Sequence, residues 1–260
     1  ELEIPVPRET LAIGESPADL ISSAKWATPE YVTNEGLVRF ALAATCLISE
    51  DRKIVIDPCI SFDQCKAAHG EAQASRFFAA MAASGFPAEE VDLILHTHID
   101  GVGWDTRPEG EGWVPGFPNA RHLFTRAELE RVLEADTDET RALQVLLDAQ
   151  LVEQVDAPLD VGPHVRLEPA PGHTPGNVNV WIESEGESAV VVGDLLLHPL
   201  QCADPEWAGL DFDAERAVAA RRRVLAEATE RGSLVIGPHF ASPGAFHVVA
   251  DGAGWRPRGS

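Results

Sequence analysis

The chain has 260 residues, of which 45% are hydrophobic and 24% are charged, and these values exclude a disordered or collagen-like chain. Its 42 acidic residues outnumber its 20 Lys and Arg residues, which gives a formal net charge of -22. Because nucleic acids and anionic membranes both select basic surfaces, we expect neither of them as a partner.

No repeat or break in composition divides the sequence, so we expect a single domain over residues 1–260. No run approaches the roughly 18 apolar residues that cross a bilayer, and the first residues do not have the pattern of a signal peptide. The cysteines have neither metal-ligand nor disulfide-framework spacing, so we expect free thiols and a cytoplasmic location. They are Cys46, Cys59, Cys65 and Cys202.

Apolar patterns predict the elements of the first half in chain order. We expect strands over 37–48, 54–57, 91–95 and 121–124, and helices over 71–84 and 139–150. Thr125 and Glu128 have the spacing of a capping box, which predicts the start of another helix. The segment 101–119 is rich in Gly and Pro and is predicted to be a loop.

In the second half we expect strands over 164–168, 234–236 and 246–249, and a hairpin of 178–182 with 189–192 around Glu185-Gly186. A helix is predicted over 214–229, with Arg221, Arg222 and Arg223 on its polar side. Strands dominate both halves and helices follow them. This order indicates an α/β fold of two packed sheets with helices outside.

The most informative segment is His96-Thr97-His98-Ile99-Asp100, which follows an apolar strand directly. In an extended stretch, residues two apart share a face, so these two imidazoles and the carboxylate can converge. Such groups bind zinc and other divalent first-row metals.

Three further segments offer ligands of the same kind. His173 lies in the Gly- and Pro-rich loop 171–176, whereas Asp194 and His239 follow the apolar strands around 190–192 and 234–236. A carboxylate next to a buried strand is costly unless it has a partner, and a metal ion is a suitable one.

This order of segments resembles the metallo-β-lactamase fold hydrolases, over residues 37–249. The resemblance implies an αββα sandwich of two mixed β-sheets flanked by helices, with metals at one edge of the sheets. The residues Val102-Gly103-Trp104, and His198-Pro199-Leu200-Gln201 after Asp194, are similar to the branch with methyl parathion hydrolase and N-acyl homoserine lactonases.

The resemblance also implies residue roles. A first metal would be bound by His96, His98 and His173, a second by Asp100 and His239, and Asp194 would bridge both. Water or hydroxide between the metals would attack a carbonyl or phosphoryl centre, because a metal lowers the pKa of water from about 16 to about 7. Asp100 would be catalytic by orienting this nucleophile or moving its proton.

The sequence departs from the family pattern at Gly101, where that pattern has a second-metal histidine. We therefore expect one firmly bound zinc and a weak or absent second metal. Two alternatives stay open, namely iron or manganese at this oxygen-rich site, or a replacement histidine. The candidates for that histidine are His198, His69 and His122.

Trp104 and His198 are the candidate substrate-binding residues. Trp104 could line an apolar pocket or pin its loop to the body of the protein. Some lactonases of the family place a tyrosine soon after the bridging aspartate. Here the only tyrosine is Tyr31, and Leu195, Leu196 and Leu197 follow Asp194.

The function predicted from these features is metal-dependent hydrolysis of an ester, lactone or related bond in a small molecule. One alternative is a mono-iron oxidoreductase of the persulfide dioxygenase type, which an impaired second site would suit. Another is a ligand-binding member of the family without turnover, because a fold alone does not fix chemistry. The substrate and the oligomeric state stay open.

Overall fold

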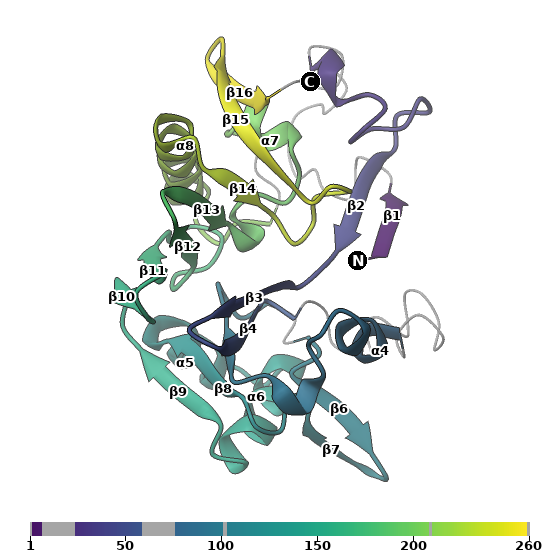
Figure 1. Cartoon of the computed structure of the whole chain (residues 1–260), viewed down its shortest axis with the longest axis vertical. Helices are drawn as coiled ribbons and strands as arrows, with labels where there is room; N and C mark the ends of the chain where they lie inside the picture. Colours follow the sequence, from purple (N-terminus) through teal and green to yellow (C-terminus); the bar gives the residue numbers. More distant parts are fainter. Residues whose placement is uncertain (1, 7–23, 59–75, 101–102, 208–209, 259–260) are drawn as a thin grey trace. The chain divides into compact units, whose positions relative to one another are not determined.

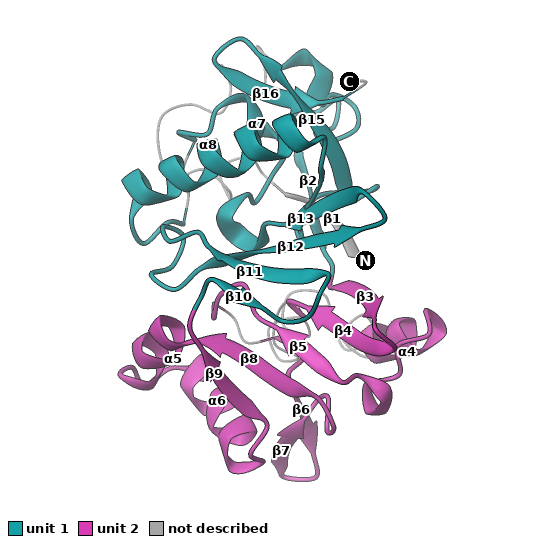
Figure 2. Ribbon diagram, turned by 60° about the vertical axis from the view of Figure 1, so that its left-hand side comes forward, with its two compact units in different colours: residues 1–43, 157–260 teal, residues 44–156 magenta. Residues whose placement is uncertain are grey.

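The computed structural model describes residues 2–6, 24–58, 76–100, 103–207 and 210–258 (Figure 1). Cys59, Cys65, His69 and Gly101 lie outside these residues. The chain divides into two compact units, with residues 1–43 and 157–260 in unit 1 and residues 44–156 in unit 2 (Figure 2). Each unit contains a mixed sheet and helices, so the predicted α/β class is confirmed.

Among the described residues of unit 1, seven strands form a sheet in the order β10-β11-β12-β13-β14-β15-β16, and β1 pairs separately with β2. Within this sheet, as far as the structure describes it, β13 and β14 are parallel and all the other neighbouring strands are antiparallel. The strands are β1 (Leu2–Val6), β2 (Val38–Leu42), β10 (Leu159–Asp160), β11 (Val165–Pro169), β12 (Val178–Ser184), β13 (Glu187–Val191), β14 (Leu234–Ile236), β15 (Ala245–Asp251) and β16 (Gly254–Pro257).

The hairpin of β12 and β13 has the predicted turn. Its two central residues, Glu185 and Gly186, have φ angles of 54° and 87°. A two-residue turn with both φ angles positive matches the right-handed twist of the paired strands. This match explains why the sequence located the hairpin correctly.

The helices of unit 1 are α7 (Leu200–Ala203) and α8 (Ala214–Arg231), with the short 3-10 helices η2 (Lys25–Ala27) and η4 (Gly193–Leu195). Helix α8 begins at Asp213, whose carboxylate accepts a hydrogen bond from the Arg216 amide at 3.0 Å. It ends at Gly232, which has a left-handed φ of 68°. The helix packs against β13 and β15, and its buried alanines and leucine join the core of this unit.

The prediction that Arg221 lies on the polar side of α8 is wrong. Its side chain is 0% exposed, and the guanidinium donates to both oxygens of Asp211 at 2.8 and 2.7 Å and to the Leu195 carbonyl at 2.6 Å. Arg221 follows Ala217 by four residues and precedes Val224 by three, so it lies on the apolar face. The buried partners explain why a charged residue is tolerated there.

Among the described residues of unit 2, five strands form a sheet in the order β3-β4-β5-β8-β9, and β6 and β7 form a separate hairpin. The pair β3-β4 is antiparallel, and the other neighbours in the sheet are parallel. The elements are β3 (Thr45–Ser49), β4 (Arg52–Ile56), α4 (Arg76–Ala83), η3 (Ala88–Glu90), β5 (Leu93–Leu95), β6 (Thr106–Glu109), β7 (Gly112–Pro115), β8 (Arg121–Thr125), α5 (Arg126–Leu133), α6 (Asp138–Asp148) and β9 (Val152–Val155).

Two predicted segments need correction. The apolar run 37–48 forms two strands, β2 and β3, because it breaks at residues 43–44 and the two halves join different sheets. The predicted loop 101–119 contains the hairpin β6-β7, whose turn uses Gly110 at a φ of 61°. The glycines therefore mark a hairpin turn instead of an irregular loop.

The predicted capping box at the start of α5 is also absent. Thr125 occupies the N-cap position, but its side chain makes no capping hydrogen bond. The Glu128 carboxylate is buried and accepts hydrogen bonds from the Ile99 amide at 2.9 Å and from Arg131 at 2.8 Å. Glu128 therefore ties α5 to the segment that follows β5, and this tertiary contact replaces the local one.

The buried Arg221–Asp211 pair gives a stability prediction. Arg221→Met leaves the Asp211 carboxylate buried without its guanidinium, and we expect the free energy of unfolding to fall by about 3–5 kcal/mol. Arg222→Met on the same helix removes an exposed ion pair with Glu206 and should cost less than about 1 kcal/mol. Urea unfolding of both variants is the measurement, and equal losses would contradict this account.

Candidate metal centre

The segment after β5 carries the two histidines and the aspartate that the sequence analysis selected. Buried residues Leu93, Ile94 and Leu95 form the strand, and His96 and Thr97 continue in buried positions. His98 is half-buried and Asp100 is exposed. The three candidate ligands therefore become more exposed from His96 to Asp100, although Ile99 between them is buried.

Asp57, which the sequence analysis did not select, holds this segment in place. Its carboxylate accepts hydrogen bonds from the Thr97 amide at 2.8 Å and from the Thr97 hydroxyl at 2.6 Å. The same hydroxyl lies 2.9 Å from His98 Nδ1. Because the hydroxyl proton goes to Asp57, His98 Nδ1 must be the donor in this contact, which leaves Nε2 as the nitrogen of the neutral ring that can bind a metal.

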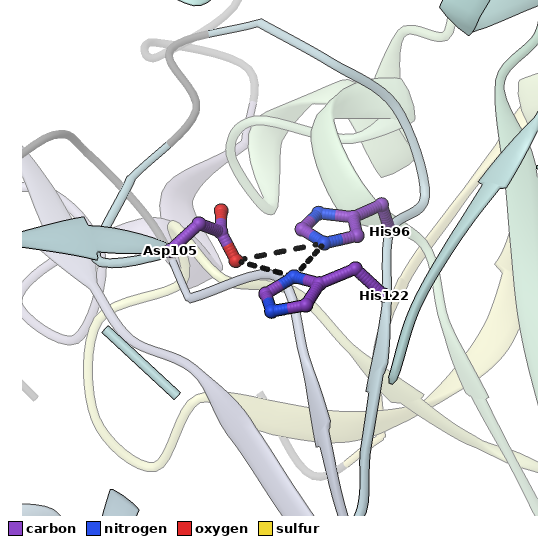
Figure 3. Close-up of side chains that lie close together, drawn as sticks. All are labelled: His96, Asp105 and His122. Atoms are coloured by element: carbon purple, nitrogen blue, oxygen red, sulfur yellow. Dashed lines mark hydrogen bonds and ion pairs between the residues drawn. The ribbon is translucent and has the colours of Figure 1, made fainter. Parts of the chain in front are cut away.

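His96 has neighbours that its motif did not predict. Its Nε2 lies 3.3 Å from His122 Nδ1 and 3.5 Å from an Asp105 oxygen, and the ring stacks on Phe124 (Figure 3). Burial lowers the pKa of His96 to about 3, which outweighs the opposing effect of the Asp105 carboxylate. The ring is therefore neutral at pH 7, the form that binds metals.

In unit 1, His173 lies in a tight loop after β11. The Gly172 amide donates to the Thr174 carbonyl at 3.0 Å, and Gly172 has a φ of 151°. A Cβ atom on Gly172 would lie 2.2 Å from the backbone nitrogen of Ala217, so only glycine allows the loop to approach α8 this closely. Packing against α8 therefore explains the glycine of this Gly-His pair, and the candidate metal chemistry explains the histidine.

Asp194 lies within η4, directly after β13, and it faces two histidines of the same unit. One of its oxygens is 3.0 Å from His239 Nε2, and the other is 3.8 Å from His173 Nε2. The ring of His239 stacks on Phe40, and its Nδ1 donates to the Ala41 carbonyl at 2.9 Å. A neutral His239 therefore directs its Nε2 lone pair at a carboxylate oxygen, so a proton or a cation is needed between them.

The other nitrogen of His173 faces a buried carboxylate. His173 Nδ1 lies 3.6 Å from Asp211, the residue that pairs with Arg221. Burial raises the pKa of Asp211, but His173 and Arg221 together hold the pKa below its usual value. An ionised carboxylate behind an imidazole fixes the ring and raises its basicity, as around metal-binding histidines. No pattern in the sequence indicated Asp211, because its role depends on tertiary contacts.

The two candidate substrate-binding residues are both buried. Trp104 stacks on Phe77 with ring centroids 4.6 Å apart and belongs to the core of unit 2. His198 Nε2 donates to the Tyr31 carbonyl at 3.1 Å, and its Nδ1 accepts from the Leu200 amide at 3.2 Å. These contacts favour packing roles for both side chains, and they occupy both nitrogens that a replacement metal ligand would need.

A comparison of the sequence with protein-family models agrees with this fold and with these side chains. The model of the metallo-β-lactamase superfamily matches residues 41–239. The chain belongs to this superfamily. No curated protein matches the sequence. Among the described residues of this superfamily member, no helix has the length and hydrophobicity required to cross a bilayer.

Solved structures show the same fold. A dizinc quorum-quenching lactonase, AidC, in complex with a product has a TM-score of 0.77 and 18% identity, over 98% of this chain and 90% of that one. The hydrolase AbOPH has a TM-score of 0.71 and 22% identity, over 99% and 88%. A probable metal-dependent hydrolase from Staphylococcus aureus has a TM-score of 0.73 and 16% identity, over 99% and 94%. At these low sequence identities, the comparisons show a similar fold and nothing more.

The Asp57–Thr97 contact gives a prediction on metal affinity. Asp57→Ala removes both acceptors that hold the backbone and side chain of Thr97, so the segment carrying His98 becomes less preorganised. We expect zinc affinity to fall roughly 10–100-fold, the usual effect of removing an outer partner of a metal ligand. The measurement is competition with a chromophoric chelator.

Asp51→Ala is the matched control, because Asp57 and Asp51 both have a positive φ, of 46° and 65°, but Asp51 lies exposed in the turn between β3 and β4. Its substitution should leave the zinc affinity unchanged. A loss of affinity that is equal in both variants would contradict a specific role for Asp57.

Burial of His198 predicts a pH dependence of stability. Burial lowers the pKa of His198 to about 4, from an ordinary value of 6.5. Between these values the unfolded chain binds a proton that the folded protein does not, so stability falls as the pH decreases. From pH 7 to pH 5 this group should contribute a loss of about 2 kcal/mol.

The measurement is urea unfolding at both pH values. His198→Gln removes the titrating group and should lose about 2 kcal/mol less than the wild type over this range. His164→Gln replaces an exposed histidine and should follow the wild type. The account is wrong if all three proteins lose the same free energy.

Proposed function

We propose that this protein is a metal-dependent hydrolase of small-molecule esters, lactones or related bonds. The observation that carries the proposal is the Asp194 carboxylate with one histidine at each oxygen, His239 at 3.0 Å and His173 at 3.8 Å. This set of donors suits a divalent first-row ion such as zinc. The proposed second group of ligands is His98 and Asp100, and the resemblance adds His96.

A bound divalent ion would supply Lewis acidity, which lowers the pKa of water towards neutrality and polarises a substrate oxygen. The residues of the chain hold and orient the ligands. The Asp211 carboxylate lies 3.6 Å behind His173 Nδ1, and the Ala41 carbonyl fixes the tautomer of His239. Asp100 is exposed at the end of its segment, where its carboxylate can accept a proton during hydrolysis.

The proposed bond type follows from the family and from the similar structures. AidC is a lactonase in complex with a product, N-hexanoyl-L-homoserine, and AbOPH is a hydrolase. The only tyrosine of this chain, Tyr31, is buried beside His198. We therefore propose lactone or ester hydrolysis without a tyrosine hydrogen bond to the substrate carbonyl.

The test is hydrolysis of a panel of N-acyl homoserine lactones and aryl esters by the full chain loaded with zinc, manganese or iron. We expect turnover that chelation abolishes and metal restores. Asp194→Asn should reduce kcat/KM at least about 100-fold, because a direct ligand matters more than its outer partners.

Asp204→Asn is the control, because Asp204 follows the neighbouring helix α7 and its carboxylate accepts only a local hydrogen bond from the Glu206 amide among the contacts described. This variant should keep wild-type turnover. A folded, metal-loaded protein without hydrolysis across the panel would refute the proposal. Oxygen consumption with a persulfide substrate by the iron form would favour the oxidoreductase instead.

A further inference from the structure

We propose that His96, Asp105 and His122 form a separate, buried zinc site inside unit 2. The three side chains converge on one point from three different segments (Figure 3). Asp105 and His122 have no part in the proposed hydrolytic centre. The new site therefore goes beyond the proposed function, and it reassigns the Nε2 atom of His96 from the first metal of the resemblance.

The distances between the three ligand atoms match a tetrahedral zinc site. His96 Nε2, His122 Nδ1 and the Asp105 oxygen are separated by 3.2, 3.3 and 3.5 Å. With zinc–ligand bonds of about 2.0–2.1 Å, the edges of a tetrahedron are about 3.3 Å, whereas octahedral edges are about 2.9 Å. The spacing of the three atoms therefore suits one ion bound to all of them.

Burial gives an independent reason to expect a cation. The side chains of Asp105 and His122 are 1% and 0% exposed, and the nearest Asp105 oxygen makes no hydrogen bond. A buried carboxylate oxygen without a hydrogen bond is costly. A divalent ion bound by all three groups would neutralise its charge.

The sheet explains why the two histidines meet. Strands β5 and β8 are parallel, and Ile94 pairs with His122 in their register. Residues two apart share a face of a strand, so His96 lies on the face of Ile94, and Phe124 lies on the face of His122. The stacking of His96 on Phe124, at 3.9 Å between ring centroids, confirms this arrangement.

Asp105 reaches the histidines from the start of the hairpin β6-β7. The backbone around it is held at two points, because the Trp104 amide donates to the Pro58 carbonyl at 3.1 Å and the Gly116 amide donates to the Asp105 carbonyl at 2.7 Å. Trp104 also belongs to the core of unit 2. The carboxylate is therefore presented by rigid backbone beside an apolar core, which suits a preorganised metal site.

Three protein ligands leave one tetrahedral position for water. A zinc ion here would join the segment after β5, the start of β8 and the residue before the hairpin β6-β7, so it would stabilise unit 2. We therefore expect this zinc to raise the Tm of the folded protein, because an ion that binds only the native state stabilises it.

The test compares zinc content per chain in the full-length wild type and in two variants. Asp105→Asn keeps the shape of the side chain but removes its charge, and Asp194→Asn does the same in the proposed hydrolytic centre. After dialysis against metal-free buffer, we expect Asp105→Asn to lose one zinc equivalent and the Tm increase that zinc produces. Unchanged zinc content in folded Asp105→Asn would overturn the new site.

The two variants also separate this inference from the proposed function. If only Asp194→Asn loses zinc, the hydrolytic centre stands and the new site is wrong. If only Asp105→Asn loses zinc, the new site stands and the proposed hydrolytic centre fails. His164→Gln, which removes an exposed histidine, should keep the full wild-type zinc content.

A second measurement covers the case in which Asp105→Asn does not fold. Crystals of the wild-type protein grown with zinc should give an anomalous-scattering peak within bonding distance of His96 Nε2, His122 Nδ1 and Asp105. Zinc peaks elsewhere, with none at these three atoms, would overturn the new site.

Discussion

Both units depend on one constraint, which is that a buried carboxylate must have partners of opposite charge or with polar hydrogens. Asp57 holds Thr97, Glu128 holds the amide of Ile99, and Asp211 holds Arg221. The first two contacts hold the segment that follows β5 in unit 2, and the third joins the segment before α8 to that helix in unit 1. The segment with His96 and His98 is thus held by buried carboxylates, so the same requirement that stabilises the fold also orients these candidate ligands.

The sequence could predict the features that depend on local pattern. Histidines and aspartates at strand ends, the positive-φ turn at Glu185-Gly186 and the long helix α8 all follow from spacing over a few residues. The side chains of His173, Asp194 and His239 do converge within unit 1. Their part in a metal site remains a proposal, as do the roles of His98 and Asp100.

The features that sequence reasoning missed depend on register and on tertiary partners. His122 meets His96 only because β5 and β8 pair with a particular alignment, and no pattern within either strand specifies it. Glu128 looks like a capping residue until the Ile99 amide is placed beside it. Arg221 differs, because its spacing from Ala217 and Val224 already indicated the buried face, and its charge concealed that signal.

The close approach of Gly172 to Ala217 has a consequence for how this protein can evolve. The same helix meets the His173 loop at Ala217 and supports Asp211 through Arg221, one turn further along. A larger residue at position 217 would push on the loop, and a shifted helix would move the carboxylate behind the imidazole. Substitutions in the core of unit 1 therefore change the orientation of the candidate ligand His173. The chemistry of the site can thus change through substitutions in α8 alone.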